Sequence, residues 1–429
     1  MPAEGGPARR PARIPALRRL VVDLTPLRVS RDFRLLWGGE LVSQFGSQIM
    51  LVALFVQVYE LTGSVAAVGL IGLVQFVPMV LVALGVGPQI DLRDRRVLLL
   101  GAEVGLALAS VVLLGGVIAG DPPLVLVYGA AALNAASASL SLAARAAMTP
   151  NLVPAGQLAQ ASALNHLMWN AAGVLGPAVG GVIVGRAGLA WAYGIDVASY
   201  AVALGCVFAL RPQRPDRTGA DPGDRGWQAV LNGFRYLRGK RVLQSTFTID
   251  LVAMIFGMPR ALFPVLAVEQ FGRGPEAVGW LFSAIALGAT LGGLGSGWVG
   301  RVRHHGRAIL IAVSVWGLAI VGFGLSGDRL PVAFACLAVA GAADMISAVF
   351  RGTLQQLVVP DALRGRLVSF NVLVVAGGPR IGDAEAGFVA AAFSPTVSVV
   401  SGGLLCLAGV AFIAAAVPAF SRWTPGDPA

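Results

Sequence analysis

Long hydrophobic stretches, separated by short polar turns, account for most of the chain. Each is long enough for an α-helix to cross the hydrocarbon core of a bilayer, which takes about 20 residues. The pattern therefore predicts an all-α membrane protein with twelve transmembrane helices, at approximately 34–58, 66–90, 97–119, 124–145, 162–185, 189–210, 243–268, 276–300, 307–326, 331–351, 367–393 and 396–420.

The second half of the chain repeats the first. Ala67-Val68-Gly69 recurs as Ala277-Val278-Gly279, 210 positions later. At the same offset Glu40 aligns with Asp250, and further along, at an offset of 206, Arg145, Pro154 and Asn165 align with Arg351, Pro360 and Asn371. Duplicated helical units are typical of secondary transporters. The repeat predicts two pseudo-symmetric six-helix bundles that move against each other.

The spans and the repeat divide the chain into five parts. We expect a basic cytoplasmic tail at 1–33, bundles at 34–210 and 243–420, a cytoplasmic linker at 211–242 and a short tail at 421–429. Within the linker, apolar residues recur at helical spacing among arginines, which predicts a helix lying at the membrane interface or acting as a spacer; they are Trp227, Val230, Leu231, Phe234 and Leu237.

Composition and charge limit the class of protein. With 56% apolar and 13% charged residues and a mean hydropathy of +0.76, the chain is not an ordinary soluble protein. Arginines concentrate in the N-terminal tail, the turn 93–96, the linker and the turn 301–307, all on one side of the predicted topology. The positive-inside rule then places both termini in the cytoplasm. This asymmetry explains the net charge of +10 without a nucleic-acid partner.

The same composition indicates where the protein works. Nearly all basic residues are arginine, which favours a bacterial source and hence the plasma membrane. The first 30 residues have no apolar core followed by a cleavage site, so we expect no removable signal peptide. The three cysteines lie in separate spans, and their spacing indicates neither a disulfide nor a metal site.

The turn between spans two and three contains a recognisable motif. Gly87 is followed by Asp91 and then by a basic run that ends in Arg95 and Arg96. This resembles the signature of the major facilitator superfamily, although Leu92 occupies the place where an arginine is expected. The resemblance implies a cytoplasmic latch between helices, formed by Gly87, Asp91, Arg95, Arg96 and Arg145. The matching turn 297–301 has no acid, so we expect the latch in the first half.

Span five contains Gly176, Pro177, Gly180 and Gly181. These residues resemble the motif of the antiporter branch, in which glycines and a proline let a bent helix pack closely on its neighbours. Span eleven, from 377 to 387, together with 351–366, is similar to the enterobactin-exporter and macrolide-efflux-like branch of drug:proton antiporters. The resemblance implies a small-molecule substrate exchanged for protons by a single chain.

Ionisable residues inside the spans are functional candidates because a charge at the centre of a bilayer costs at least about 2.5 kcal/mol. In span eleven Arg380 and Asp383 are three residues apart and can form an ion pair on one helical face. That pair is either structural or in contact with substrate or proton. Arg260 in span seven could pair with Asp383 or contact an anionic substrate.

Span one has a polar stripe on an otherwise apolar helix, made of Glu40, Ser43, Gln44 and Ser47. In this superfamily the first helices of both repeats line the central cavity, so the resemblance implies that Glu40 and Asp250 oppose each other there. Desolvation would favour their protonated forms, which makes them candidates for proton exchange. Alternatively, both acids could pair with Arg34 or Arg241 near the cytoplasmic ends.

Further polar residues in the spans complete the set of candidates. Asp344 lies seven residues before Arg351, nearly on the same helical face, and joins the acids that could couple protons. Three residues of span five and one of span four could line the cavity; they are His166, Trp169, Asn170 and Asn134. No arginine lies at the middle of span four, although many proton antiporters of the superfamily have one.

The hypothesis that fits best is a proton-coupled exporter of a small amphipathic compound, a drug or a siderophore. The alternative within the same fold is uptake or facilitated transport of a nutrient. An enzyme or a sensor is a remote alternative, because the three histidines form no catalytic or metal-ligating group. The sequence has no phosphate-binding Gly-Lys-Ser/Thr loop and predicts no cofactor.

Overall fold

The computed structural model describes residues 23–120, 122–213, 228, 234–425 and 427; of residues 86–92 and 361–373 only the backbone is described. Within these ranges the chain is helical and has no strand. The first bundle consists of α2 (Arg31–Thr62), α3 (Val65–Leu92), α4 (Arg95–Ala119), α5 (Leu124–Leu152), α6 (Leu158–Ala187) and α7 (Leu189–Phe208). A short α1 (Thr25–Val29) precedes it, and a single turn, η2 (Ala155–Gln157), leads into α6.

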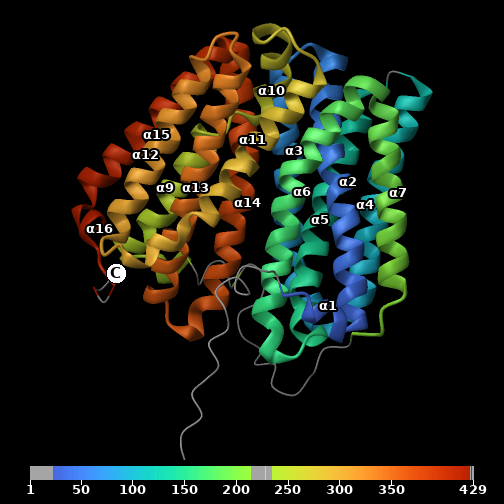
Figure 1. Ribbon diagram of the computed structural model, residues 1–429, viewed down its shortest axis with the longest axis horizontal. Helices are drawn as coiled ribbons and strands as arrows, with labels where there is room; N and C mark the ends of the chain where they lie inside the picture. The colour runs from blue at the N-terminus through green and yellow to red at the C-terminus, as the bar shows by residue number, and fades with distance from the viewer. Residues whose placement is uncertain (1–22, 121, 214–227, 229–233, 426, 428–429) are drawn as a thin grey trace, which may run out of the picture.

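The second bundle repeats this order, as Figure 1 shows. Its first span is α9 (Arg241–Phe256), continued by η3 (Arg260–Leu262), α10 (Phe263–Val265) and η4 (Leu266–Gln270). The others are α11 (Pro275–Leu294), α12 (His305–Gly324), α13 (Leu330–Val358), α14 (Asp361–Ala392) and α15 (Pro395–Ala416), with a turn η5 (Ser296–Arg301) after α11 and a short α16 (Pro418–Arg422) at the end.

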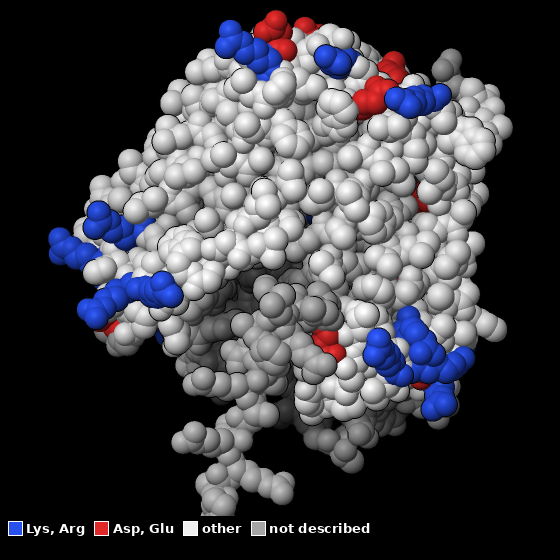
Figure 2. All heavy atoms as spheres, in the orientation of Figure 1, with Lys and Arg blue, Asp and Glu red and all other residues white. Residues whose placement is uncertain are grey.

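These helices confirm the predicted twelve-helix membrane fold. Among the described residues, eleven helices are long and apolar enough to cross a bilayer, and α14, 32 residues long, takes the place of the twelfth. On the face shown in Figure 2, charged side chains gather at two opposite ends, and the wide band between them is nearly uncharged. We call the end that holds α1 and α16 the terminal end, and the opposite one the far end.

Three predicted spans differ from the structure in where they end or break, each for a physical reason. Span four continues to Leu152, because a helix satisfies its own backbone hydrogen bonds whether or not its last turns are apolar. Span seven is interrupted after Phe256 by a segment that contains Pro259, where the missing proline N–H breaks the helical ladder. Span eight ends at Leu294 and continues only as the tight turn η5.

The two bundles contact each other through glycines on two pairs of helices, α3 with α14 and α6 with α11. A methyl group placed on Gly69 would lie 2.6 Å from the carbonyl oxygen of Asp383 and 2.9 Å from Cα of Gly387. On Gly181 it would lie 2.6 Å from the carbonyl oxygen of Pro275. Since Gly69 begins α3 and Gly181 ends α6, both contacts belong to the far end, where the bundles are closed against each other.

The linker is described only in part. Trp227, Val230 and Leu231 of the predicted interface helix lie outside the described residues. Of the remaining two, Leu237 is buried and Phe234 is 61% exposed. An apolar pair with one buried and one exposed member is consistent with a helix lying along a surface.

Candidate transport cavity and buried ion pairs

A polar cavity of about 240 Å³ lies in the first bundle, and the predicted polar stripe of α2 forms one of its walls. Its lining is drawn from α2, α4, α5, α6, α7 and α14, and consists of Glu40, Ser43, Gln44, Ser47, Glu103, Leu106, Asn134, Ala138, Ser141, Leu142, Arg145, Trp169, Tyr200 and Arg380. Seven of the residues predicted from the sequence for the cavity or the proton site therefore lie together. Arg145, which was predicted as part of the cytoplasmic latch, also lines this cavity.

Arg145 is the central cation of this cavity. Its Nη1 lies 3.2 Å from Oε2 of Glu40, and its Nη2 lies 2.9 Å from Oε1 of Glu103. Nε donates to Oγ of Ser141, one turn earlier on the same helix, at 3.1 Å. One guanidinium thus bridges carboxylates of two other helices. Because α5 extends to Leu152, this side chain lies inside the bundle, and the role predicted for Arg145 in a cytoplasmic latch stays a prediction.

The second bundle has a related cluster around Arg351, the repeat partner of Arg145. Its Nη2 lies 2.8 Å from Oδ1 of Asp250 and 3.6 Å from Oδ1 of Asp344. Nη1 donates to Oγ of Ser347 at 2.8 Å. A first-helix acid paired with a Ser-x-x-x-Arg sequence on the fourth helix is therefore common to both repeats.

The two acids predicted to face each other instead face arginines of their own bundles. Asp250 is 3% exposed and does not line the cavity, whereas Glu40 does. The alternative partners were also wrong. The Arg34 guanidinium donates to the carbonyl oxygen of Leu27, and no ion pair joins Arg241 to Asp250 among the described residues.

Arg260 forms a two-point ion pair with Asp383. Nη2 lies 2.6 Å from Oδ2 and Nε lies 3.3 Å from Oδ1. The same-helix pair of Arg380 with Asp383 does not form, since the parallel donors of Arg260 already hold that carboxylate. Arg380 Nη1 instead donates to the carbonyl oxygen of Ala376 at 2.6 Å. No carboxylate within the described ranges pairs with Arg380, which extends from α14 into the cavity of the first bundle.

His166 and Asn170 are exposed on α6 and do not line this cavity, whereas Trp169 of the same stripe does. No group of three His, Cys, Asp or Glu that could hold a metal ion occurs among the described residues.

The basic turn before α4 connects elements of the first bundle. Arg95 Nη1 donates to the carbonyl oxygen of Ala147 on α5 at 2.9 Å. Arg96 Nε donates to that of Val207 on α7 at 3.2 Å. The backbone N–H of Gln213, at the start of the linker, donates to Oδ1 of Asp94. Only the backbone of Gly87 and Asp91 is described, so the cytoplasmic latch between helices stays a prediction.

The glycine motif of α6 packs this helix closely on both bundles. A methyl group on Gly176 would lie 2.5 Å from Cβ of Gln48, and one on Gly180 would lie 2.9 Å from Cα of Ile49, both on α2. The backbone at Pro177 and Gly181 packs instead on α11. The predicted close packing is therefore present, and it lies between α2 and the second bundle.

Three functional candidates were not predicted. Glu103 on α4 and Tyr200 on α7 line the cavity. Asp196 is fully buried, with Oδ2 accepting from Oγ of Ser110 at 2.5 Å and Oδ1 without a partner in the described structure. A signal existed for two of them, because Glu103 and Asp196 are each the single acid within an otherwise apolar span.

Two helical bundles of the same order, a polar cavity and buried ion pairs define a membrane transport protein of the major facilitator superfamily. The chain belongs to the transmembrane secretion effector family, which it matches over residues 21–424. It is 27% identical over 391 residues to the enterobactin exporters EntS of Shigella boydii and Escherichia coli, over 91% of this chain and 93% of theirs.

Solved structures show the same fold. The nucleoside transporter NupG superposes with a TM-score of 0.71 at 13% identity, covering 91% of this chain and all of that one. A bacterial homologue of the iron transporter ferroportin superposes with a TM-score of 0.69 at 16% identity, covering 92% and 99%. The family match and the exporter relatives show that the chain is a multi-pass membrane transporter and not an enzyme.

Proposed function

We propose that this protein exports a small amphipathic compound, of the siderophore or drug type, from a bacterial cytoplasm in exchange for protons. The observation that supports this most directly is the cavity in which Arg145 is shared by Glu40 and Glu103. The similarity to enterobactin exporters supports the direction of transport and the substrate class.

The ion pairs offer a way to couple substrate to protons. Breaking a buried pair by removing one partner costs about 3–5 kcal/mol. When the Glu40 carboxylate accepts a hydrogen bond from the substrate, or binds a proton, it no longer needs the ion pair with Arg145. Substrate and proton then compete for one carboxylate, which is the requirement for antiport.

The cavity also indicates what the substrate carries. Arg380 provides a cation without a carboxylate partner within the described chain, and suits an acidic or acceptor group. Trp169 and Tyr200 offer aromatic surface, while Ser43 and Asn134 offer hydrogen bonds. A compound with aromatic rings and both donors and acidic groups, such as a catecholate, matches these features.

The position of the cavity fits binding from the cytoplasmic side. The arginine-rich terminal end belongs in the cytoplasm by the positive-inside rule. Glu40 lies nine residues, about 14 Å, into α2 from that end, and the glycine contacts close the far end. One chain holds both bundles, so we propose that the monomer transports.

Inside-out vesicles with an acidic lumen test this proposal. A pH-sensitive dye reports proton exit when catecholates, macrolides or cationic dyes are added. We expect the wild type to respond to its substrate, Glu40→Gln to lose the response, and Glu60→Gln, a matched change further along α2, to keep it. Asp250→Asn lies outside the cavity and keeps it too, provided that the variant inserts.

The outcomes separate the parts of the proposal. A full response from Glu40→Gln would exclude this carboxylate as the proton site. Binding of a compound to purified protein without any dye response would contradict proton coupling. Accumulation of the compound on the cytoplasmic side, measured in whole cells, would favour uptake instead of export.

A further inference from the structure

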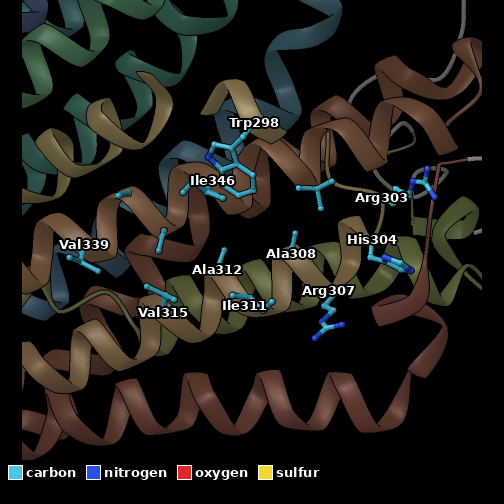
Figure 3. Close-up of a pocket in the computed structure, with 13 residues that line it drawn as sticks. Trp298, Arg303, His304, Arg307, Ala308, Ile311, Ala312, Val315, Val339 and Ile346 are labelled. Atoms are coloured by element: carbon cyan, nitrogen blue, oxygen red, sulfur yellow. The ribbon is translucent and has the colours of Figure 1, made fainter. Parts of the chain in front are cut away.

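A second concave site lies on the outer flank of the second bundle, between α12 and α13. Figure 3 shows it as a groove with a basic end, formed by Arg303, His304 and Arg307, and an apolar length. Its volume is about 500 Å³. The principal packing partners of α12 are α9, α13, α15 and α16, all in the second bundle, so this groove is separate from the transport cavity.

From its basic end to Val315, the whole groove is about as long as one membrane leaflet is thick. Along α12 the lining residues recur at helical spacing from His304 to Val315, and Val339 and Ile346 of α13 face them. Eleven residues of helix rise about 16 Å, which is close to half of the roughly 30 Å hydrocarbon core. Ile311 is 55% exposed and Val339 49% exposed. A single acyl chain would cover these side chains.

The basic end is free to bind an anion. Arg303 and Arg307 are exposed, and within the described structure their side chains form no hydrogen bond or ion pair. Asp427 interacts electrostatically with His304, and its Oδ2 accepts from the backbone N–H of Thr424 at 2.8 Å. Helix α12 also begins here, and its first backbone N–H groups add partial positive charge at the same end.

We propose that this groove binds an anionic phospholipid, with the phosphate at Arg303 and Arg307 and one acyl chain lying between α12 and α13. The charge of the groove complements the headgroup, and its length matches one leaflet. The groove belongs to the leaflet at the arginine-rich terminal end, where basic residues near a membrane interact favourably with anionic lipid. A soluble anion would leave the exposed apolar length uncovered.

Native mass spectrometry of the purified full chain tests this binding. Dioleoyl phosphatidylglycerol is titrated against the zwitterionic dioleoyl phosphatidylcholine. Each cation near an anionic lipid contributes about a five-fold change in affinity, so we expect Arg303→Gln combined with Arg307→Gln to weaken phosphatidylglycerol binding about 30-fold. Both positions are exposed, and the thermal unfolding temperature serves to confirm that the variant is folded.

Two further variants distinguish a built groove from general attraction. Arg28→Gln combined with Arg31→Gln removes the same charge from the terminal end of the first bundle, and we expect it to bind as the wild type does. Val339→Trp fills the exposed apolar length and leaves the charges in place, and we expect it to weaken binding several-fold.

Three results would overturn the proposal. The first is equal loss in both arginine pairs, which would mean nonspecific charge attraction. The second is unchanged binding in Val339→Trp, which would mean that no chain occupies the groove. The third is displacement of the lipid by glycerol phosphate at equal concentration, which would mean a site for soluble phosphates.

Discussion

Replacing Gly69 with alanine tests how the far end closes. Gly69 packs against the backbone of α14, so an added methyl group meets the carbonyl oxygen of Asp383 at 2.6 Å and Cα of Gly387 at 2.9 Å. Ordinary contacts of a Cβ atom lie at about 3.4–4 Å. Neither neighbour is a side chain that could turn away, so α3 and α14 must separate by several tenths of an ångström.

The cost of that separation falls only on the state in which the far end is closed. Overpacking a well-packed contact costs about 1–3 kcal/mol. If the bundles are apart in the other state, the methyl group costs nothing there, and the equilibrium shifts toward opening about 5- to 150-fold. Gly181→Ala acts on the second contact, between α6 and α11, and we expect its effect to add to that of Gly69→Ala.

Pulsed electron spin resonance between labels at the far end measures the shift. Arg186 and Arg273 are exposed there and lie in different bundles, so cysteines at these positions report the separation. The matched control is Gly85→Ala on the same helix, since a methyl group at Gly85 has no neighbour within 4 Å. A distance distribution for Gly69→Ala that equals the one for Gly85→Ala would refute the reasoning.

The remaining predictions concern individual ion pairs and follow from the same geometry. Asp383→Asn leaves the Arg260 guanidinium without its carboxylate, and we expect a loss of about 3–5 kcal/mol in the free energy of unfolding, read from thermal unfolding in detergent. Arg351→Gln leaves two acids unpaired and destabilises by a similar amount at neutral pH; a loss that stays constant at low pH, where the acids bind protons, contradicts this. Arg96→Gln frees the end of α7, so trypsin should cut the start of the linker about 10-fold faster than in the control Arg93→Gln.

Hydropathy was sufficient to predict the spans because each span must satisfy its own backbone hydrogen bonds in lipid, and the internal repeat predicted their division into two bundles. The internal repeat also aligned the correct positions. Glu40 and Asp250 occupy equivalent places in the two clusters, and so do Arg145 and Arg351. The sequence could not show that these residues bind each other within a bundle. That depends on how deep Arg145 lies, and the hydrophobic pattern ended span four at the arginine itself.

The sequence predicted which residues share a face of one helix better than it predicted which residues contact each other across helices. Arg380 and Asp383 satisfy the spacing for a pair on one helix, yet Arg260 takes the carboxylate from another element with a two-point contact. Periodicity describes a single helix, whereas the choice among partners depends on distances across the bundle. Glu103 illustrates the same limit, because it was not predicted from the sequence and only packing revealed its pairing with Arg145.

The two arginine clusters differ in one respect that bears on transport. In the first bundle the second acid, Glu103, comes from another helix, so Arg145 connects α2, α4 and α5. In the second bundle the second acid, Asp344, lies on the same helix as Arg351, and the cluster connects only α9 and α13. Protonating Glu40 therefore loosens a three-helix connection at the wall of the cavity, whereas protonating Asp250 loosens a two-helix connection outside it. In the mechanism that we propose, this asymmetry favours the first bundle as the site of proton coupling, and Arg380 of α14 connects the second bundle to its cavity.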